Sequence, residues 1–189
     1  MRTFIAIELP KEIKLELAKL QEYLKQSGAD VKWVAPENIH LTLKFLGERD
    51  DKKIKEIELI AEEIAKNNAG FEISLSSLGT FPGTNYPRVV WIGITQGAEQ
   101  TEKIAAELEE RIAKIGIPKE ERGFSAHITI GRVKSNLNKE KLIQELSSTQ
   151  LMAGKNLKFK AGQITLFKST LTPRGPIYEI LKTANLTNS

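Results

Sequence analysis

The chain has 189 residues and a formal net charge of +4 at pH 7, and its 40% hydrophobic and 28% charged residues are typical of a folded globular protein rather than a disordered one. It contains no cysteine, which excludes disulfide bonds, thiolate metal sites and cysteine nucleophiles. The apolar stretch at the start is too short for a signal peptide or a membrane span, so we expect a cytoplasmic protein that does not bind membranes. The positive charge favours an anionic partner.

Hydrophobic periodicity predicts alternating strands and helices. In chain order these are strand 3–9, helix 10–27, strands 31–34 and 40–47, helix 51–67, strands 71–78 and 88–95, helix 98–115, strand 127–133, helix 138–147, and strands 156–171 and 176–182. Residues 79–88, rich in Gly and Pro, predict a loop, and the polar tail 183–189 predicts a frayed end. Strands joined by short turns favour antiparallel or mixed sheets in an α+β fold. No low-complexity linker divides the chain, so we expect one domain over residues 1–189.

The two histidines of the chain lie in matching strand segments, HLTLKFLG and HITIGRV. Side chains alternate between the two faces of a strand, so His40 and Thr42 share one face, and His127 and Thr129 share the corresponding face of the other strand. The apolar residues between them point the opposite way, as in a half-buried strand. Each segment therefore presents an imidazole and a hydroxyl on a rigid support.

Two histidines can act as an acid and base couple near neutral pH, because one imidazole can be neutral while the other is protonated. Such a pair suits displacement at phosphorus: one histidine takes a proton from water, the other gives a proton to the leaving oxygen, and threonine hydroxyls bind the non-bridging oxygens. The near symmetry of the segments leaves open which histidine is the acid. A zinc site is the competing interpretation, but two histidines without cysteine are fewer ligands than zinc usually takes. We therefore expect neither a metal nor a cofactor.

At these motifs the chain resembles the two-histidine (2H) phosphoesterase superfamily, named for paired H-x-T-x motifs, and within it the RNA 2′,3′-cyclic phosphodiesterases, also called 2′-5′ RNA ligases. The similarity covers nearly the whole chain. The segments that carry it are RTFIAIELP, WVAPENIHLTLKFLGE, FPGTNYPRVVWIGI and STLTPRGPIYEIL. In the second motif, Ala126 stands where the family often has proline, and Ile130 and Gly131 replace a Leu-Ala pair before Arg132. These differences leave the imidazole and the hydroxyl unchanged.

The resemblance implies a bilobal α+β fold, with two pseudo-symmetric lobes of mostly antiparallel sheet and outer helices around a central groove. It also implies metal-independent hydrolysis of RNA 2′,3′-cyclic phosphate ends, such as those of tRNA halves, to 2′-phosphate. By the same resemblance, His40 is the proton donor and His127 is the proton acceptor. Thr42 and Thr129 are then the residues that bind the phosphate.

Further contacts to RNA are less determined by the sequence. Strict alternation places Arg132 on the face opposite His127, so it contacts the phosphate only if a bulge at Gly131 redirects the strand. The same alternation places Lys44 on the face of the first motif. Candidates for RNA contact are Lys44, Arg88 and Tyr86, followed by Lys168, Arg174, Trp33, Phe45, Phe81, Trp91 and Tyr178. Aromatic residues in alternating strands are more often core residues than base platforms.

Two alternatives stay open. The same site can run in reverse and join a cyclic phosphate to a 5′-hydroxyl through a 2′-5′ linkage, although the excess of water favours hydrolysis. The chain can also be an RNA-end binding module without turnover, an interpretation against which the intact histidines and threonines argue. The sequence gives no oligomeric state, and a monomer is the default expectation.

Overall fold

The computed structural model describes residues 1–149 and 157–188, and within them the chain forms two antiparallel sheets and four α-helices, which confirms the α+β prediction. The four-stranded sheet has the order β3 (His40–Glu48), β1 (Arg2–Glu8), β8 (Gln163–Thr172) and β9 (Gly175–Asn185). The five-stranded sheet has the order β2 (Val31–Trp33), β6 (His127–Val133), β5 (Val89–Ile94), β4 (Phe71–Phe81) and β7 (Lys158–Ala161). Neighbouring strands run antiparallel in both sheets.

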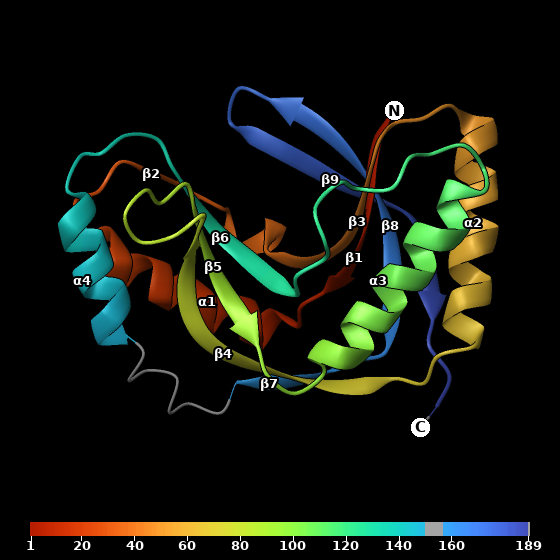
Figure 1. Cartoon of the computed structure of the whole chain (residues 1–189), viewed down its shortest axis with the longest axis horizontal. Helices are drawn as coiled ribbons and strands as arrows, with labels where there is room; N and C mark the ends of the chain where they lie inside the picture. The colour runs from red at the N-terminus through yellow and green to blue at the C-terminus, as the bar shows by residue number, and fades with distance from the viewer. Residues whose placement is uncertain (150–156, 189) are drawn as a thin grey trace.

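The helices lie at the two ends of the molecule, two beside each sheet (Figure 1). α2 (Asp51–Lys66) and α3 (Ala98–Ala113) pack against each other and against the four-stranded sheet. α1 (Lys11–Lys25) and α4 (Lys139–Thr149) pack against each other beside the five-stranded sheet. A short 3₁₀ helix, η1 (Pro36–Asn38), leads into β3. α1 lies beside the five-stranded sheet but follows β1 of the four-stranded sheet in the chain. In the same way, α3 lies beside the four-stranded sheet but follows β5 of the five-stranded sheet.

The apolar side of the two histidine strands forms part of the core. Leu41 and Leu43 on β3 and Ile128 and Ile130 on β6 are each at most 2% exposed. The histidines and threonines that alternate with them are half-buried. The predicted separation of an apolar face from a polar face is therefore confirmed at both motifs.

Three boundaries differ from the sequence prediction. β4 continues to Phe81, so the loop expected from residue 79 begins after it. The strand expected over 156–171 is two strands, β7 and β8, separated by Gly162, and residue 156 lies outside the described residues. The tail expected to fray from residue 183 continues β9 to Asn185, because its backbone pairs with the start of β8.

A buried glutamine connects α1 to the strand that carries the second histidine. Gln21 is 2% exposed, and its Nε2 donates hydrogen bonds to the carbonyl oxygens of Val34 at 2.8 Å and Ile130 at 2.9 Å. Since a buried carbonyl without a donor is costly, this side chain fixes the helix against β6.

We expect Gln21→Leu to lower the free energy of unfolding by about 1 to 3 kcal/mol, because it removes the Gln21 hydrogen bond to the Val34 carbonyl oxygen and one of the two hydrogen bonds to the Ile130 carbonyl oxygen, while nearly preserving volume. Urea unfolding measures the effect. Lys19→Leu, on the exposed side of the same helix, is the control and should change stability by less than about 0.5 kcal/mol. Equal effects of the two substitutions would contradict the role of Gln21.

Candidate active site

His40 is the first residue of β3, and its ring is held from two sides. Its Nδ1 lies 2.7 Å from the carbonyl oxygen of Asn38. The ring packs 4.8 Å from the ring of Phe4 and 5.4 Å, edge-on, from that of Tyr178. Because a carbonyl oxygen only accepts hydrogen bonds, Nδ1 carries the hydrogen and Nε2 is left for a substrate.

His127 is the first residue of β6 and has the same setting. Its Nδ1 lies 2.7 Å from the carbonyl oxygen of Ser125, two residues before it in the chain, as Asn38 is before His40. Phe81 meets its ring at 5.0 Å and 88°, and Phe81 in turn stacks on Trp91 at 4.9 Å. The second imidazole therefore also keeps its Nε2 free of the backbone.

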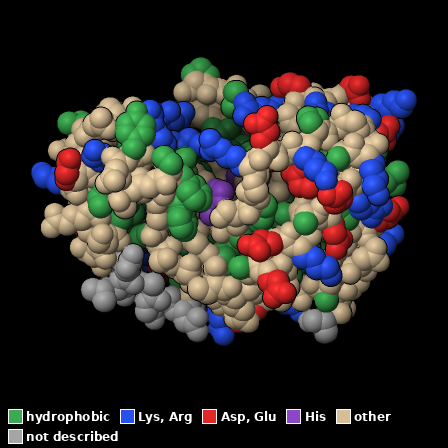
Figure 2. Space-filling model, viewed as in Figure 1, with side chains coloured by type: hydrophobic (Ala, Val, Ile, Leu, Met, Phe, Trp, Pro, Cys, Tyr) green, Lys and Arg blue, Asp and Glu red, His purple; other side chains and the backbone are tan. Residues whose placement is uncertain are grey.

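The two histidine strands belong to different sheets but contact each other. Figure 2 shows histidine side chains at the bottom of a hollow near the centre of the molecule, with lysine and arginine side chains along its upper rim. Each of the two imidazoles has a threonine two residues after it in the chain, and each leaves its Nε2 free to give or take a proton.

The environment of His40 favours its neutral form. Burial lowers the pKa of His40 to about 4; the hydrogen bond to the Asn38 carbonyl opposes this shift, and the positive charge of Lys14 adds to it. In the free protein at neutral pH, His40 is therefore uncharged.

A bulge in β3 changes which residues share the face of the first motif. Opposite β1, the strand has two extra residues, Leu43 between Thr42 and Lys44 and Leu46 between Phe45 and Gly47, and the first of them follows the motif. Beyond the bulge Lys44 is 1% exposed and Phe45 is 54% exposed. The prediction that Lys44 contacts RNA is therefore wrong: its Nζ is buried and lies 2.7 Å from a carboxylate oxygen of Glu109 on α3. Phe45 takes the place expected for Lys44.

β6 has a bulge at the equivalent position. Opposite β5, the extra residue is Ile130, between Thr129 and Gly131. The carbonyl oxygen of Ile130 accepts hydrogen bonds from Gln21 Nε2 at 2.9 Å and from the Val34 N–H at 3.0 Å. Both histidine strands thus have an extra residue three positions after the histidine.

A phosphate contact by Arg132 was predicted only if a bulge redirects the strand, and the bulge in β6 meets this condition. Arg132 is exposed while the residues on either side of it are buried, so it leaves the core face. A Cβ at Gly131 would lie 2.7 Å from the side chain of Val31 and 3.0 Å from that of Trp33, so the packing of these side chains leaves room only for glycine. Burial raises the pKa of Tyr178, and the positive charge of Arg132 opposes that shift, which indicates that the two side chains are near each other. The contact between Arg132 and phosphate stays a prediction.

The other predicted RNA contacts lie in different places. Tyr86 and Arg88 are exposed and stacked, with the guanidinium 4.5 Å from the ring centroid. The residue after Arg88, Val89, pairs with Arg132, so this stack lies beside the second motif. Lys168, by contrast, forms an ion pair with a glutamate on β9.

A pocket of about 340 Å³ opens beside His40. The residues that line it include Lys14, Asn38, Phe167, Pro176 and Tyr178. Phe4, Lys14 and the two carbonyls that bind Nδ1 were not predicted from the sequence. A backbone carbonyl has no sequence signal, because every residue supplies one. Phe4 and Lys14 contact the site only through the pairing of β1 with β3 and the packing of α1.

Across residues 1–149 and 157–188, no group of three or more His, Asp and Glu side chains is placed to hold a metal ion. The helices in this part of the chain are also too short or too polar to cross a membrane.

Comparison with known proteins gives one consistent family. A family model described as LigT like Phosphoesterase matches the chain twice, over residues 7–91 and 92–178. The RNA 2′,3′-cyclic phosphodiesterase of Methanocaldococcus jannaschii is 43% identical over 96% of this chain and 99% of its own length. That of Thermotoga maritima is 39% identical, over 96% and 93%.

Solved structures extend the similarity to three dimensions. E. coli LigT complexed with 3′-AMP has a TM-score of 0.77 and 28% identity, covering 99% of this chain and 98% of that one. A protein of Thermus thermophilus has a TM-score of 0.82 and 26% identity, covering 100% and 99%. The double match of the family model agrees with two similar halves, each with one histidine strand.

The low pKa of His40 predicts a loss of stability in mild acid. The unfolded chain takes up a proton on this histidine near its ordinary pKa of 6.5, whereas the folded chain does so only near 4, so stability falls as the pH drops through this window. Between pH 7 and about pH 4.5, the wild-type protein should lose on the order of 2 kcal/mol more than His40→Gln. Urea unfolding at both pH values measures this, and parallel curves would contradict it.

Proposed function

Because the chain belongs to the LigT-like phosphoesterase family, we propose that it hydrolyses the 2′,3′-cyclic phosphate at the end of an RNA and leaves a 2′-phosphate. The observation that carries the proposal is the matched setting of the two histidines, in which each Nδ1 is bonded to a backbone carbonyl. Each Nε2 is thereby available for a proton on the substrate side. The names of the relatives, RNA 2′,3′-cyclic phosphodiesterases, supply the substrate class.

The proposed reaction is a single in-line displacement. His127 Nε2 takes a proton from water as the water oxygen bonds to phosphorus, and the bond from phosphorus to O3′ breaks. His40 Nε2–H gives its proton to O3′, which leaves a 3′-hydroxyl and a 2′-phosphate. Thr42 and Thr129 hydroxyls donate to the non-bridging oxygens, where negative charge gathers in the transition state. Exchange of protons with water restores both histidines.

The charge state of His40 links substrate binding to this step. A proton donor must be protonated, but the pKa of about 4 in the free protein leaves His40 neutral near pH 7. A bound phosphate places negative charge beside the ring and raises the pKa of His40. In this proposal the substrate itself therefore charges the donor.

Residues around the hollow are suited to hold the RNA. Arg132 supplies charge for the phosphate, and Phe45 is an exposed aromatic ring 6.3 Å from Phe4, which contacts His40. The exposed stack of Tyr86 and Arg88 offers a flat surface for a base and a charge for the backbone.

We expect His40→Ala and His127→Ala each to lower kcat on an oligonucleotide with a 2′,3′-cyclic phosphate end by about 10²- to 10⁴-fold, because each removes a proton-transfer group. Thermal unfolding must show that both variants fold. Full activity in either folded variant would reject the two-histidine mechanism.

Product and metal controls belong to the same assay. The phosphate should be found on O2′, and excess RNA with a 5′-hydroxyl should not divert most of the product into a 2′-5′ joined strand. Activity should survive EDTA. Loss with EDTA and recovery with zinc would instead support a metal mechanism.

The roles of the two histidines can be separated with a phosphodiester whose leaving group is an acidic phenol, which needs no proton to depart. On this substrate His40→Ala should recover most of its lost kcat, whereas His127→Ala should stay slow because water still needs a base. The opposite result would exchange the two roles.

A further inference from the structure

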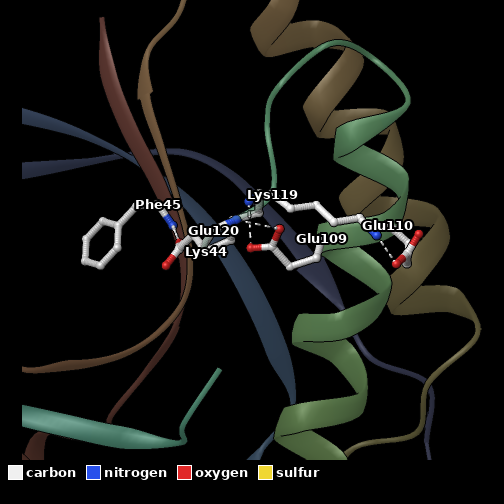
Figure 3. Close-up of polar contacts among 6 residues, drawn as sticks. All are labelled: Lys44, Phe45, Glu109, Glu110, Lys119 and Glu120. Carbon is white, nitrogen blue, oxygen red and sulfur yellow. Dashed lines mark hydrogen bonds and ion pairs between the residues drawn. The ribbon is translucent and has the colours of Figure 1, made fainter. Parts of the chain in front are cut away.

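The buried Lys44 belongs to a polar network behind the site (Figure 3). The side chain of Lys44 has 0% of its surface exposed, and Glu109, its partner on α3, has 19% exposed, with 2.7 Å between Nζ and Oε1. Removing an ammonium and a carboxylate from water is costly, and an apolar side chain of similar volume would fill the same space without this cost. The pair therefore needs an explanation other than stability.

The second oxygen of Glu109 continues the network to the segment after α3. Glu109 Oε2 accepts a hydrogen bond from the backbone N–H of Glu120 at 3.3 Å. The carboxylate of Glu120 in turn accepts from the backbone N–H of Phe45 at 3.3 Å. The network is a closed ring that leaves β3 at Lys44, passes through α3 and Glu120, and returns to β3 at Phe45.

The segment attached by this ring leads to the second histidine. Residues 114–126 connect α3 to β6, and near their end Ser125 supplies the carbonyl oxygen that binds Nδ1 of His127. β3, at the other side of the ring, begins with His40. The ring is thus a polar connection between the strand of one histidine and the backbone that orients the other.

We propose that Lys44, Glu109 and Glu120 are positioning residues. They hold the segment before His127 against β3, and so keep the two imidazoles in the relative position that in-line displacement needs. The inference rests on the proposed function, because the relative position of the two imidazoles matters only if both histidines act on one phosphate. The bulge at Leu43 turns Lys44 to this side of the strand, so the same irregularity that exposes Phe45 also starts the ring.

Glu120 allows a test that spares the buried pair, because its side chain is exposed. In Glu120→Ala we expect kcat on the cyclic-phosphate oligonucleotide to fall about 10- to 100-fold with little change in KM, as for a misplaced catalytic group. Glu120→Gln should keep at least about half of kcat, because its amide oxygen still accepts from the Phe45 N–H. Glu121→Ala, the exposed neighbour, is the matched control and should behave as wild type.

A second readout needs no activity. The chain has two histidines, so ¹H–¹⁵N spectra contain two imidazole Nδ1–H signals, both from hydrogen-bonded groups. In Glu120→Ala the Nδ1 proton of His127 should exchange with solvent several-fold faster, while the exchange rate of the Nδ1 proton of His40 stays unchanged. A merely structural role for Glu120 would not select one histidine.

The inference requires both results. It is overturned if Glu120→Ala matches Glu121→Ala in kcat, or if the exchange of His127 is unchanged. If wild type does not hydrolyse the oligonucleotide, the proposed function fails, and the exchange of His127 alone then decides whether the ring positions it.

Discussion

An imidazole has two nitrogens, so one can bond to the protein while the other stays available for a substrate. Both histidines of this chain use Nδ1 for the protein and leave Nε2 available. Each donates Nδ1–H to the carbonyl of the residue two positions earlier. That bond fixes the tautomer, and the contacts with Phe4, Tyr178 and Phe81 help to orient the rings.

The strand irregularities give the halves their different characters. In both strands an extra residue comes three positions after the histidine, and the residue five positions after the histidine leaves the core face. In β3 that residue is the apolar ring of Phe45, and in β6 it is the cation of Arg132. β3 has a further extra residue, Leu46, that β6 lacks opposite β5. The residue four positions after the histidine, which faces the core, differs as well. It is the buried Lys44 in β3, and in β6 it is Gly131, which leaves room for Val31 and Trp33. Similar bulges thus expose an aromatic ring on one strand and a cation on the other.

Alternation along the sequence was sufficient to separate the half-buried histidines and threonines from the buried apolar residues between them. The same rule failed one residue beyond the bulge, at Lys44, because a rule of period two has no way to detect an inserted residue. In β6 the glycine signalled that a bulge was possible, whereas nothing in HLTLKFLG does so. The extension of β9 was missed for a related reason: its polar residues pair with the start of β8, and backbone pairing does not depend on apolar side chains.

The sequence repeat and the spatial halves do not coincide. The two stretches matched by the family model, 7–91 and 92–178, each contribute strands to both sheets. Unfolding of one sheet therefore disrupts chain segments that also form the other sheet, so we expect the two sheets to unfold in one cooperative step. Each stretch supplies strands that complete the sheet of the other, so neither stretch contains a complete sheet by itself.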